Sequence, residues 1–208
     1  AGVFDPETAI QVVRERGLAM EKAAEGVESA MMAILGLERE PLLDICVGCD
    51  GYVSIANYNC PGQIVITGEA AAVAEAGTAL KETGARRVLP LKVSGPFHSP
   101  MMRPAGEELA KVFAGVSMNP LKVPYVANIN AEVITDCGRI EGLLVDQVSG
   151  SVRWQQSVET MLREGVDTFV EIGPGKTLTG FLRKIDKNVK AYHIGSWEEA
   201  VQVCEELK

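Results

Sequence analysis

The spacing of apolar residues predicts an amphipathic helix at the start of the chain, over residues 6–24. Asp5 followed by Pro6 is typical of a helix N-terminus. At about 100° per residue, one face of this helix carries Ala9, Val13 and Met20. Arg16 falls on the same face, where a cation is costly unless a carboxylate meets it. Arg16 therefore predicts an internal ion pair, a side chain that reaches solvent, or a contact with a carboxylate of a ligand.

Between residues 29 and 93 the pattern changes to short apolar runs that alternate with helical stretches. The predicted elements are a strand at 31–37, a helix at 41–47, strands at 52–58 and 63–67, a helix at 69–83 and a strand at 86–93. This βαββαβ order indicates a small ferredoxin-like unit.

The first of the two middle strands ends in amide side chains. Val53 and Ile55 share one face of that strand, and simple alternation places Asn57 and Asn59 on the same face. Asn59 also begins the turn Asn59-Cys60-Pro61-Gly62. The two asparagines therefore fit either the wall of a cleft or the stabilisation of a turn.

The last part of the chain predicts further α/β alternation. The predicted elements are a helix at 101–113, a strand near 123–128, helices near 140–148 and at 154–164, a strand at 168–172 and a helix through Leu182. The loop Gly173-Pro174-Gly175-Lys176-Thr177 opens that last helix and resembles part of a phosphate-binding loop. The full pattern would need glycine where Val170 stands. A tight glycine turn is the preferred interpretation, and nucleotide binding is the alternative.

One of the chain's two histidines lies in a loop that contains a glycine and two prolines, Ser94-Gly95-Pro96-Phe97-His98-Ser99-Pro100. The loop connects a predicted strand to a predicted helix, with Ser99 as N-cap and Pro100 at the first helical position. The positive end of that helix disfavours imidazolium, so His98 would be a neutral ring able to accept a proton. The alternative is a histidine with a purely structural role in the loop.

Composition excludes several classes of function. The chain has 208 residues, 47% of them hydrophobic, and 20 Lys+Arg against 28 Asp+Glu give a net charge of -8. Nucleic acid and anionic membranes are therefore poor candidate partners. The absence of a long apolar run or a secretory-type start leads us to expect a soluble, cytoplasmic protein.

The five cysteines do not form the pattern of a disulfide framework, because their number is odd and they are scattered along the chain. Cys46 and Cys49 have a C-x-x-C spacing, but neither histidine offers the second pair of a structural zinc site. We interpret these thiols as buried and inert, and we expect no metal and no bound cofactor.

Five ordered motifs resemble those of the malonyl-CoA:acyl carrier protein transacylases, the S-malonyltransferases of fatty acid synthesis. The resemblance runs from Ala1 to about Asp186. The motifs are Val13-Arg14-Glu15-Arg16-Gly17 with Met20, residues 55–63, residues 93–102, Gln147-Val148 with Val152-Arg153-Trp154, and Glu171 to Lys176.

The resemblance implies ping-pong transfer of malonyl from malonyl-CoA to a serine and then to the phosphopantetheine thiol of acyl carrier protein. It implies that His98 is the general base, oriented by the backbone carbonyl of Gln147. Arg16 would pair with the free carboxylate of malonyl. Phe97 would select malonyl, and Asn57 and Asn59 would lie where the pantetheine arm passes into the site.

One departure from the family is serious. The family's nucleophile lies in a G-x-S-x-G elbow, and Ser94, Ser99, Ser149 and Ser151 all fail that pattern. The family's oxyanion-hole glutamine is also missing. The resemblance therefore implies an N-terminal segment that these residues do not include, and a chain that is inactive alone.

The implied fold is α/β, with an incomplete α/β hydrolase-like acyltransferase domain at 1–26 and 94–208 and a ferredoxin-like insert at 27–93. Two other classes remain as alternatives, a non-catalytic binding or scaffold fragment and a nucleotide-binding protein that uses Gly173 to Thr177.

Overall fold

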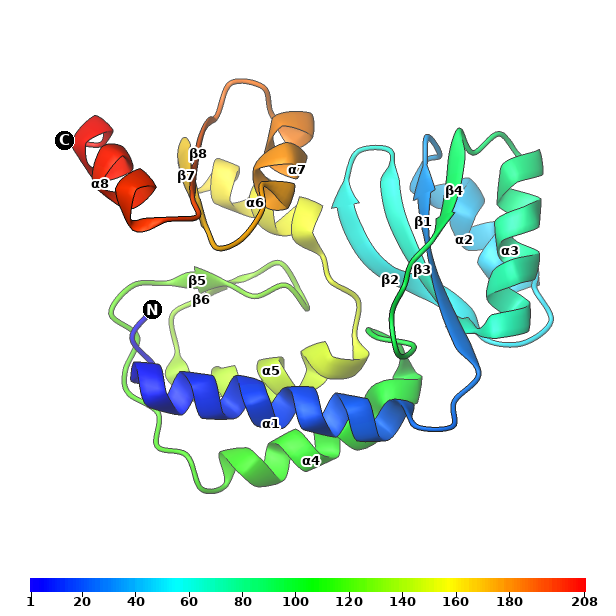
Figure 1. Cartoon of the computed structure of the whole chain (residues 1–208), viewed down its shortest axis with the longest axis horizontal. Coiled ribbons are helices and arrows are strands. Elements are labelled where there is room, and N and C mark those ends of the chain that lie inside the picture. The colour runs from blue at the N-terminus through cyan, green and yellow to red at the C-terminus, as the bar shows by residue number, and fades with distance from the viewer.

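The structure is a computed structural model that describes residues 1–208. It begins with the long helix α1, Pro6–Ala24, which crosses the lower part of Figure 1. The Asp5 carboxylate caps this helix by accepting the backbone N–H of Thr8 at 2.8 Å. The predicted helix over residues 6–24 is therefore confirmed.

The predicted apolar face of α1 is wrong at one position, because Val13 is 67% exposed. The buried residues of the helix are instead Val12, Met20 and Ala24. Steps of four residues return to nearly the same side of a helix, so Arg16 lies in one row with these three. The expectation that Arg16 shares a face with the core is therefore retained, on a face rotated by about one residue.

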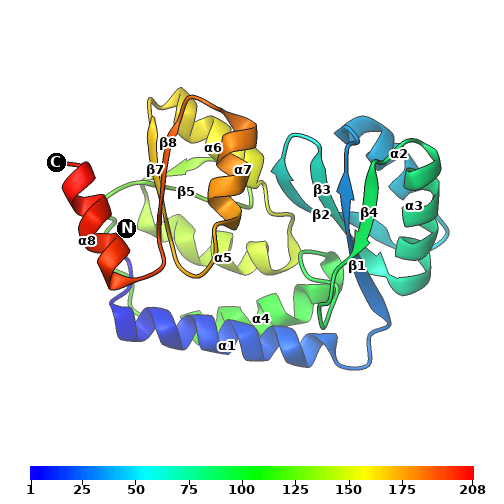
Figure 2. The same cartoon turned by 45° about the horizontal axis from the view of Figure 1, so that its top comes forward.

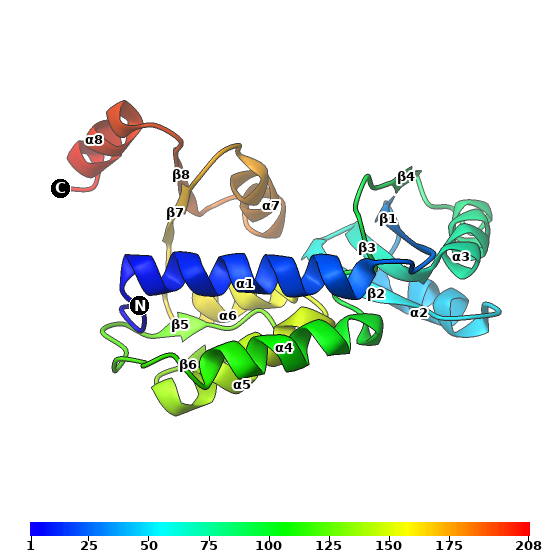
Figure 3. The same cartoon turned by 60° about the horizontal axis from the view of Figure 1, so that its bottom comes forward.

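Helix α1 packs against α4, Arg103–Phe113, and α4 packs against α5, Ile140–Ser149. Figure 3 shows α1 and α4 side by side. Their shared core contains Val12, Met20, Met102, Ala105, Leu109, Phe113 and Val148. The His98 loop packs against this helical layer through Phe97.

Residues 29–90 form a four-stranded antiparallel sheet with two helices, at the right of Figure 1. The elements are β1 Ser29–Leu35, α2 Arg39–Gly48, β2 Val53–Cys60, β3 Gln63–Glu69, α3 Ala70–Glu82 and β4 Arg87–Pro90. The predicted βαββαβ order is confirmed, and the spatial order is β2-β3-β1-β4. Strand β4 is shorter than the predicted 86–93 and ends at Pro90, which has no N–H to donate.

The two faces of the sheet differ in what covers them. Helices α2 and α3 cover one face, where Ile34, Leu42, Ile66, Val73 and Leu80 are among the buried residues. The other face carries Met31, Ala33, Ala56 and Val65, and Phe97 from the His98 loop packs against it. The sheet therefore presents its second face to the loop that carries the histidine.

The remaining elements lie above the helical layer in Figure 2, and two helices among them contact β2 at the edge of the sheet. They are the short pair β5 Tyr125–Val126 and β6 Val133–Ile134, the helix α6 Trp154–Arg163, the parallel pair β7 Thr168–Ile172 and β8 Lys190–Ile194, and the helices α7 Thr177–Ile185 and α8 Trp197–Glu206. The predicted strand near 123–128 pairs over only two residues. Two short 3₁₀ turns, Pro100–Met102 and Cys137–Arg139, precede α4 and α5.

The elements β8 and α8 lie beyond those that the hydrophobic pattern predicted. As for membranes, none of the helices combines the length and the apolar character that spanning a bilayer requires.

Candidate active site

The loop that carries His98 is fixed at both of its ends. A Cβ at Gly95 would lie 2.6 Å from the Cβ of Ala24, so only glycine lets the loop approach the end of α1 this closely. The Ser99 hydroxyl is fully buried and donates to the carbonyl of Pro96 at 2.6 Å. Ser99 is the N-cap of the turn that begins at Pro100, as predicted, but its side chain makes no capping bond because the hydroxyl donates within the loop itself.

His98 has φ 60, the left-handed region that a non-glycine residue rarely adopts. Such a conformation costs about 1–2 kcal/mol and persists where its surroundings hold it. The contacts of the ring are such surroundings, since Nδ1 lies 3.2 Å from the carbonyl oxygens of both Gln147 and Gly150. A nitrogen between two carbonyl oxygens carries the proton, so Nε2 keeps the lone pair.

The pKa of His98 lies below its ordinary value of 6.5. Burial of the ring is the largest cause, and the positive charge of Arg16 lowers the pKa further. The carbonyls of Gln147 and Gly150 act in the opposite direction without cancelling these two effects. The ring is therefore neutral at neutral pH, as the sequence predicted. The causes are burial and the charge of Arg16, whereas the prediction relied on the positive end of the following helix.

Arg16 is half-buried and has no carboxylate within salt-bridge distance. Burial lowers the pKa of its guanidinium. The neighbouring Arg14, by contrast, is exposed and pairs with Glu15 at 2.8 Å. The internal ion pair that the sequence left open for Arg16 is not formed, so a half-buried cation near His98 lacks a partner anion.

Gln147 uses its backbone and its side chain for different contacts. The backbone carbonyl accepts from His98, while Nε2 of the side chain donates to the carbonyl of Gly150 at 2.9 Å. The sequence pointed to the Gln147 carbonyl alone and missed the second acceptor, Gly150. The available signal was a glycine directly after a predicted helix, where unpaired carbonyls are expected.

Asn57 lies on the face of the sheet opposite to the predicted one. It is paired with Val65, whereas Ile55 is paired with Ile66 on the face that α2 and α3 cover. Paired residues of antiparallel strands point to the same side, and the register of β2 shifts between Ile55 and Asn57. The shift turns Asn57 toward the face against which Phe97 packs.

Asn59 is half-buried near the end of β2, where the register of the strand shifts a second time. Phe97 itself lies between the sheet and the helical layer, in contact with both of their apolar clusters. The sequence-predicted residues near His98 are therefore Arg16, Phe97 and Gln147, with Asn57 on the facing side of the sheet.

The glycine loop after β7 does not offer a free anion site at the start of α7. Oxygens of the Glu171 carboxylate accept the backbone N–H groups of Leu178 and Thr179 at 3.0 and 2.7 Å. Burial acts to raise the pKa of Glu171, but hydrogen bonds from Thr179 and Leu178 outweigh it and hold that pKa below its ordinary value. This negative charge occupies the position that a phosphate would need.

The cysteines are free thiols, and Cys46 and Cys49 do not form a disulfide. Burial raises the pKa of Cys46 to about 11, and the charge of Cys49 adds to this rise. No group of three or more His, Cys, Asp or Glu side chains could hold a metal ion. The prediction of a buried, unreactive thiol therefore fits Cys46, whereas its neighbour Cys49 is only half-buried.

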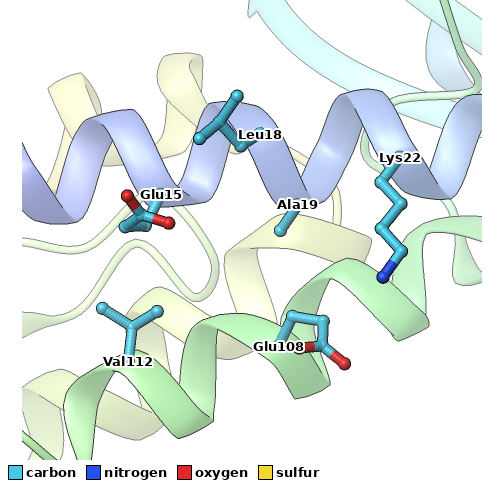
Figure 4. A pocket seen from close by; sticks show the side chains of 6 residues that line it. All are labelled: Glu15, Leu18, Ala19, Lys22, Glu108 and Val112. Atoms are coloured by element: carbon cyan, nitrogen blue, oxygen red, sulfur yellow. The ribbon is translucent and has the colours of Figure 1, made fainter.

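A hollow of about 200 Å³ lies between α1 and α4. Its lining in Figure 4 combines Glu15, Lys22 and Glu108 with Leu18, Ala19 and Val112. Charges of both signs and the absence of His98 and Arg16 from the lining separate this hollow from the candidate site.

A mixed α/β fold, an imidazole held by main-chain carbonyls and a half-buried cation without a carboxylate partner fit a class of acyl-transferring domains. The sequence matches the acyl transferase domain family over residues 1–203, nearly the whole chain. The relatives described next identify the group within it, and the chain belongs to the malonyl-CoA:acyl carrier protein transacylases.

The Bacillus subtilis (strain 168) malonyl CoA-acyl carrier protein transacylase is 40% identical over 211 residues, which cover 100% of this chain and 67% of the relative. The crystal structure of an acyl carrier protein S-malonyltransferase from Vibrio cholerae is 40% identical, with a TM-score of 0.93 over 98% of this chain and 67% of that one.

A structure of a type II PKS acyl-carrier protein in complex with its malonyl-transacylase is 37% identical. Its TM-score is 0.94 over 99% of this chain and 67% of that one. The chain therefore spans about two thirds of the length of the relatives it matches.

Proposed function

We propose that this chain supplies the base and the carboxylate-binding cation of a malonyl transfer site. The reaction moves malonyl from malonyl-CoA to the phosphopantetheine thiol of acyl carrier protein in fatty acid synthesis. The observation that carries the proposal is the neutral His98 ring, whose Nδ1 is 3.2 Å from two carbonyls, with the unpaired charge of Arg16 close enough to lower its pKa.

His98 acts twice in this mechanism. Nε2 first takes the proton of a serine hydroxyl, whose oxygen attacks the thioester carbon of malonyl-CoA, and the proton then goes to the departing coenzyme A thiolate. In the second half, Nε2 takes the proton of the carrier-protein thiol, whose sulfur attacks the malonyl ester. The serine oxygen then leaves and recovers the proton.

The other residues bind the substrate. The guanidinium of Arg16 pairs with the free carboxylate of malonyl, which gives this half-buried cation its missing anion. Phe97 forms an apolar wall beside the base and selects malonyl. Asn57 and Asn59 lie along the path of the pantetheine arm.

We assign residues 1–26 and 94–208 to an α/β hydrolase-like large domain and residues 27–93 to a ferredoxin-like insert. The antiparallel order β2-β3-β1-β4, with both helices on one face, supports the assignment of the insert. The site then lies between the two, where Phe97 contacts both apolar clusters.

The serine and the oxyanion donor are contributed by a segment that is not among these 208 residues, because no G-x-S-x-G pattern occurs in them. The isolated chain is then inactive. Intact-mass analysis after incubation with malonyl-CoA tests this, since a malonyl adduct on a serine of this chain would contradict it.

The transfer function is tested by adding to the chain the remaining third of the Bacillus subtilis relative, as a fusion or a separate polypeptide. Malonyl transfer to acyl carrier protein is expected only in the combined protein. His98→Ala should reduce it by about 10²–10⁴-fold. The matched control is His193→Asn at the second histidine, which the mechanism does not use. Transfer by the combined His98→Ala protein at the wild-type rate would exclude His98 as the base.

Specificity gives a second readout in the same protein. Arg16→Ala should lower the ratio of malonyl to acetyl transfer by at least about 30-fold, since only malonyl carries the carboxylate. Arg14→Ala, the neighbouring arginine paired with Glu15, should leave the ratio unchanged. Equal losses for malonyl and acetyl would remove Arg16 from carboxylate binding.

A further inference from the structure

The segment between α5 and α6, residues 150–153, lies along the outer edge of β2, and we refer to it as the strap. The N–H of Val152 donates to the carbonyl of Ala56 at 2.7 Å, and the carbonyl of Val152 accepts the N–H of Tyr58 at 2.8 Å. These two bonds form a one-residue parallel bridge between Val152 and Asn57. The strap therefore joins the sheet of residues 29–90 to the helical layer.

The same strap holds the imidazole of His98. The carbonyl of Gly150 lies 3.2 Å from Nδ1, the same distance as the carbonyl of Gln147. A Cβ at Gly150 would collide with the Ile129 side chain and lie 3.0 Å from the carbonyl of Asp146. The strap therefore packs tightly at Gly150, and a movement of the strap away from β2 would carry the Gly150 carbonyl away from Nδ1.

A side chain of the strap adds a third bond to β2. The Ser151 hydroxyl donates to the carbonyl of Ile55 at 2.6 Å. The carbonyls of Ile55 and Ala56 thus both accept from the strap, although successive carbonyls of a regular strand point to opposite sides. The register shift of β2 between Ile55 and Asn57 accounts for this, because a bulge redirects the backbone locally.

We propose that Ser151 is a positioning residue for His98, whose hydroxyl seats the strap on the bulge of β2 and thereby places the Gly150 carbonyl against Nδ1. Ser151 does not touch the reacting atoms, and its hydroxyl proton is committed to Ile55. The orientation of the ring is thus set partly by β2, which lies some 40 residues before the histidine in the sequence.

The consequence for the ring follows from its two acceptors. Both carbonyls favour a proton on Nδ1 and raise the pKa of His98 against the effect of burial. If the strap moves away, Nδ1 keeps only the Gln147 carbonyl. The ring should then titrate at lower pH and leave the Nδ1–H tautomer for part of the time. The catalytic meaning of this effect rests on the proposed function, but the effect on the ring does not.

The test uses the full chain labelled with ¹⁵N at its two histidines, with ring signals followed by NMR as a function of pH. Ser151→Ala should lower the titration midpoint of His98 by about 0.5 pH unit and shift its Nδ1 signal toward the second tautomer. Ser149→Ala, two residues away and without a side-chain hydrogen bond, is the matched control. Arg16, the charged group that acts on the ring, is the same in both variants.

Ser151→Thr keeps the hydroxyl and should restore the wild-type signals, whereas Ser151→Cys, a weaker donor, should fall between Thr and Ala. The ring signals of His193 serve as an internal reference and should be the same in the wild type and in the Ser151 variants. If Ser151→Ala does not fold, the ring signals of Ser151→Cys provide the test instead. Wild-type His98 signals in either the Ala or the Cys variant would overturn the positioning role.

Transfer assays in the combined protein separate this role from the proposed function. Ser151→Ala should lower kcat by about 3–10-fold with little change in KM, because the base is misoriented while substrate contacts remain. A shifted ring in a protein that transfers no malonyl would leave the positioning role intact and count against the proposed function alone.

Discussion

His98 contacts the main chain of Gln147 but not its side chain. Nδ1 of the ring lies 3.2 Å from the Gln147 carbonyl oxygen, while the Gln147 amide donates to the carbonyl of Gly150 at 2.9 Å. One residue thus accepts from the ring and also steadies the second acceptor. The variants of Gln147 can separate these two contributions, since any substitution keeps the backbone carbonyl.

Gln147→Ala should lower the free energy of unfolding by only about 1 kcal/mol. It removes the Nε2 donor to Gly150, but it also removes Oε1 of the same amide, which is buried without a hydrogen-bond partner. Gln147→Glu should cost more, since a carboxylate would face the carbonyls of Gly150 and Ser151 and could not donate to them. Urea unfolding of both variants measures the order, and a glutamate variant as stable as wild type would contradict it.

The pKa of His98 should make stability depend on pH in a defined direction. Burial and the charge of Arg16 hold the folded pKa below the ordinary 6.5 of an unfolded histidine. Between these two values the unfolded chain binds more protons, so the contribution of His98 to stability is fully present above 6.5 and is lost as the pH falls through the folded pKa.

Unfolding by urea at a series of pH values measures this effect. The decline on acidification should be smaller in His98→Asn, which cannot titrate, than in wild type. An identical decline in both proteins would show that His98 does not contribute.

The charge of Arg16 should be visible in the titration of His98. Arg16→Met removes the charge and keeps an apolar side chain, so the pKa of His98 should rise toward its ordinary value. Arg14→Met is the control, because Arg14 is exposed and paired with Glu15. Histidine NMR provides the measurement, and an unchanged His98 titration in Arg16→Met would show that the two groups do not interact.

The hydroxyl of Ser99 should contribute to stability through the His98 loop. Ser99→Ala leaves the carbonyl of Pro96 without its 2.6 Å donor in a fully buried position, so the free energy of unfolding should fall by about 1–3 kcal/mol. Ser94 in the same loop is exposed, so Ser94→Ala should change the free energy of unfolding by less than about 0.5 kcal/mol. Equal effects of the two substitutions would contradict the role of the buried bond.

The cysteines should react in the order of their exposure. Cys204 is exposed, while Cys46 is buried with its pKa raised to about 11. A thiol reagent at neutral pH should therefore modify Cys204 first and leave Cys46 intact in the folded chain. Peptide mass mapping after limited labelling measures this, and early modification of Cys46 would revive a redox role for the C-x-x-C pair.

Local patterns in the sequence determined most of the elements. The cap at Asp5 and the apolar spacing predicted α1, and alternating runs predicted the βαββαβ order, because such patterns depend on contacts within a few residues along the chain. The motif around His98 indicated the candidate base, and the family resemblance indicated Arg16 and Gln147.

Tertiary structure decided where these residues point and what they touch. The carbonyls that hold His98 come from 49 and 52 residues further along the chain, and no local pattern encodes such a contact. The bulge of β2 reversed the face of Asn57, since a single register shift moves a side chain to the other side of a sheet. Whether Arg16 had a partner likewise depended on which side chains the fold brought near it, and the fold brought no carboxylate.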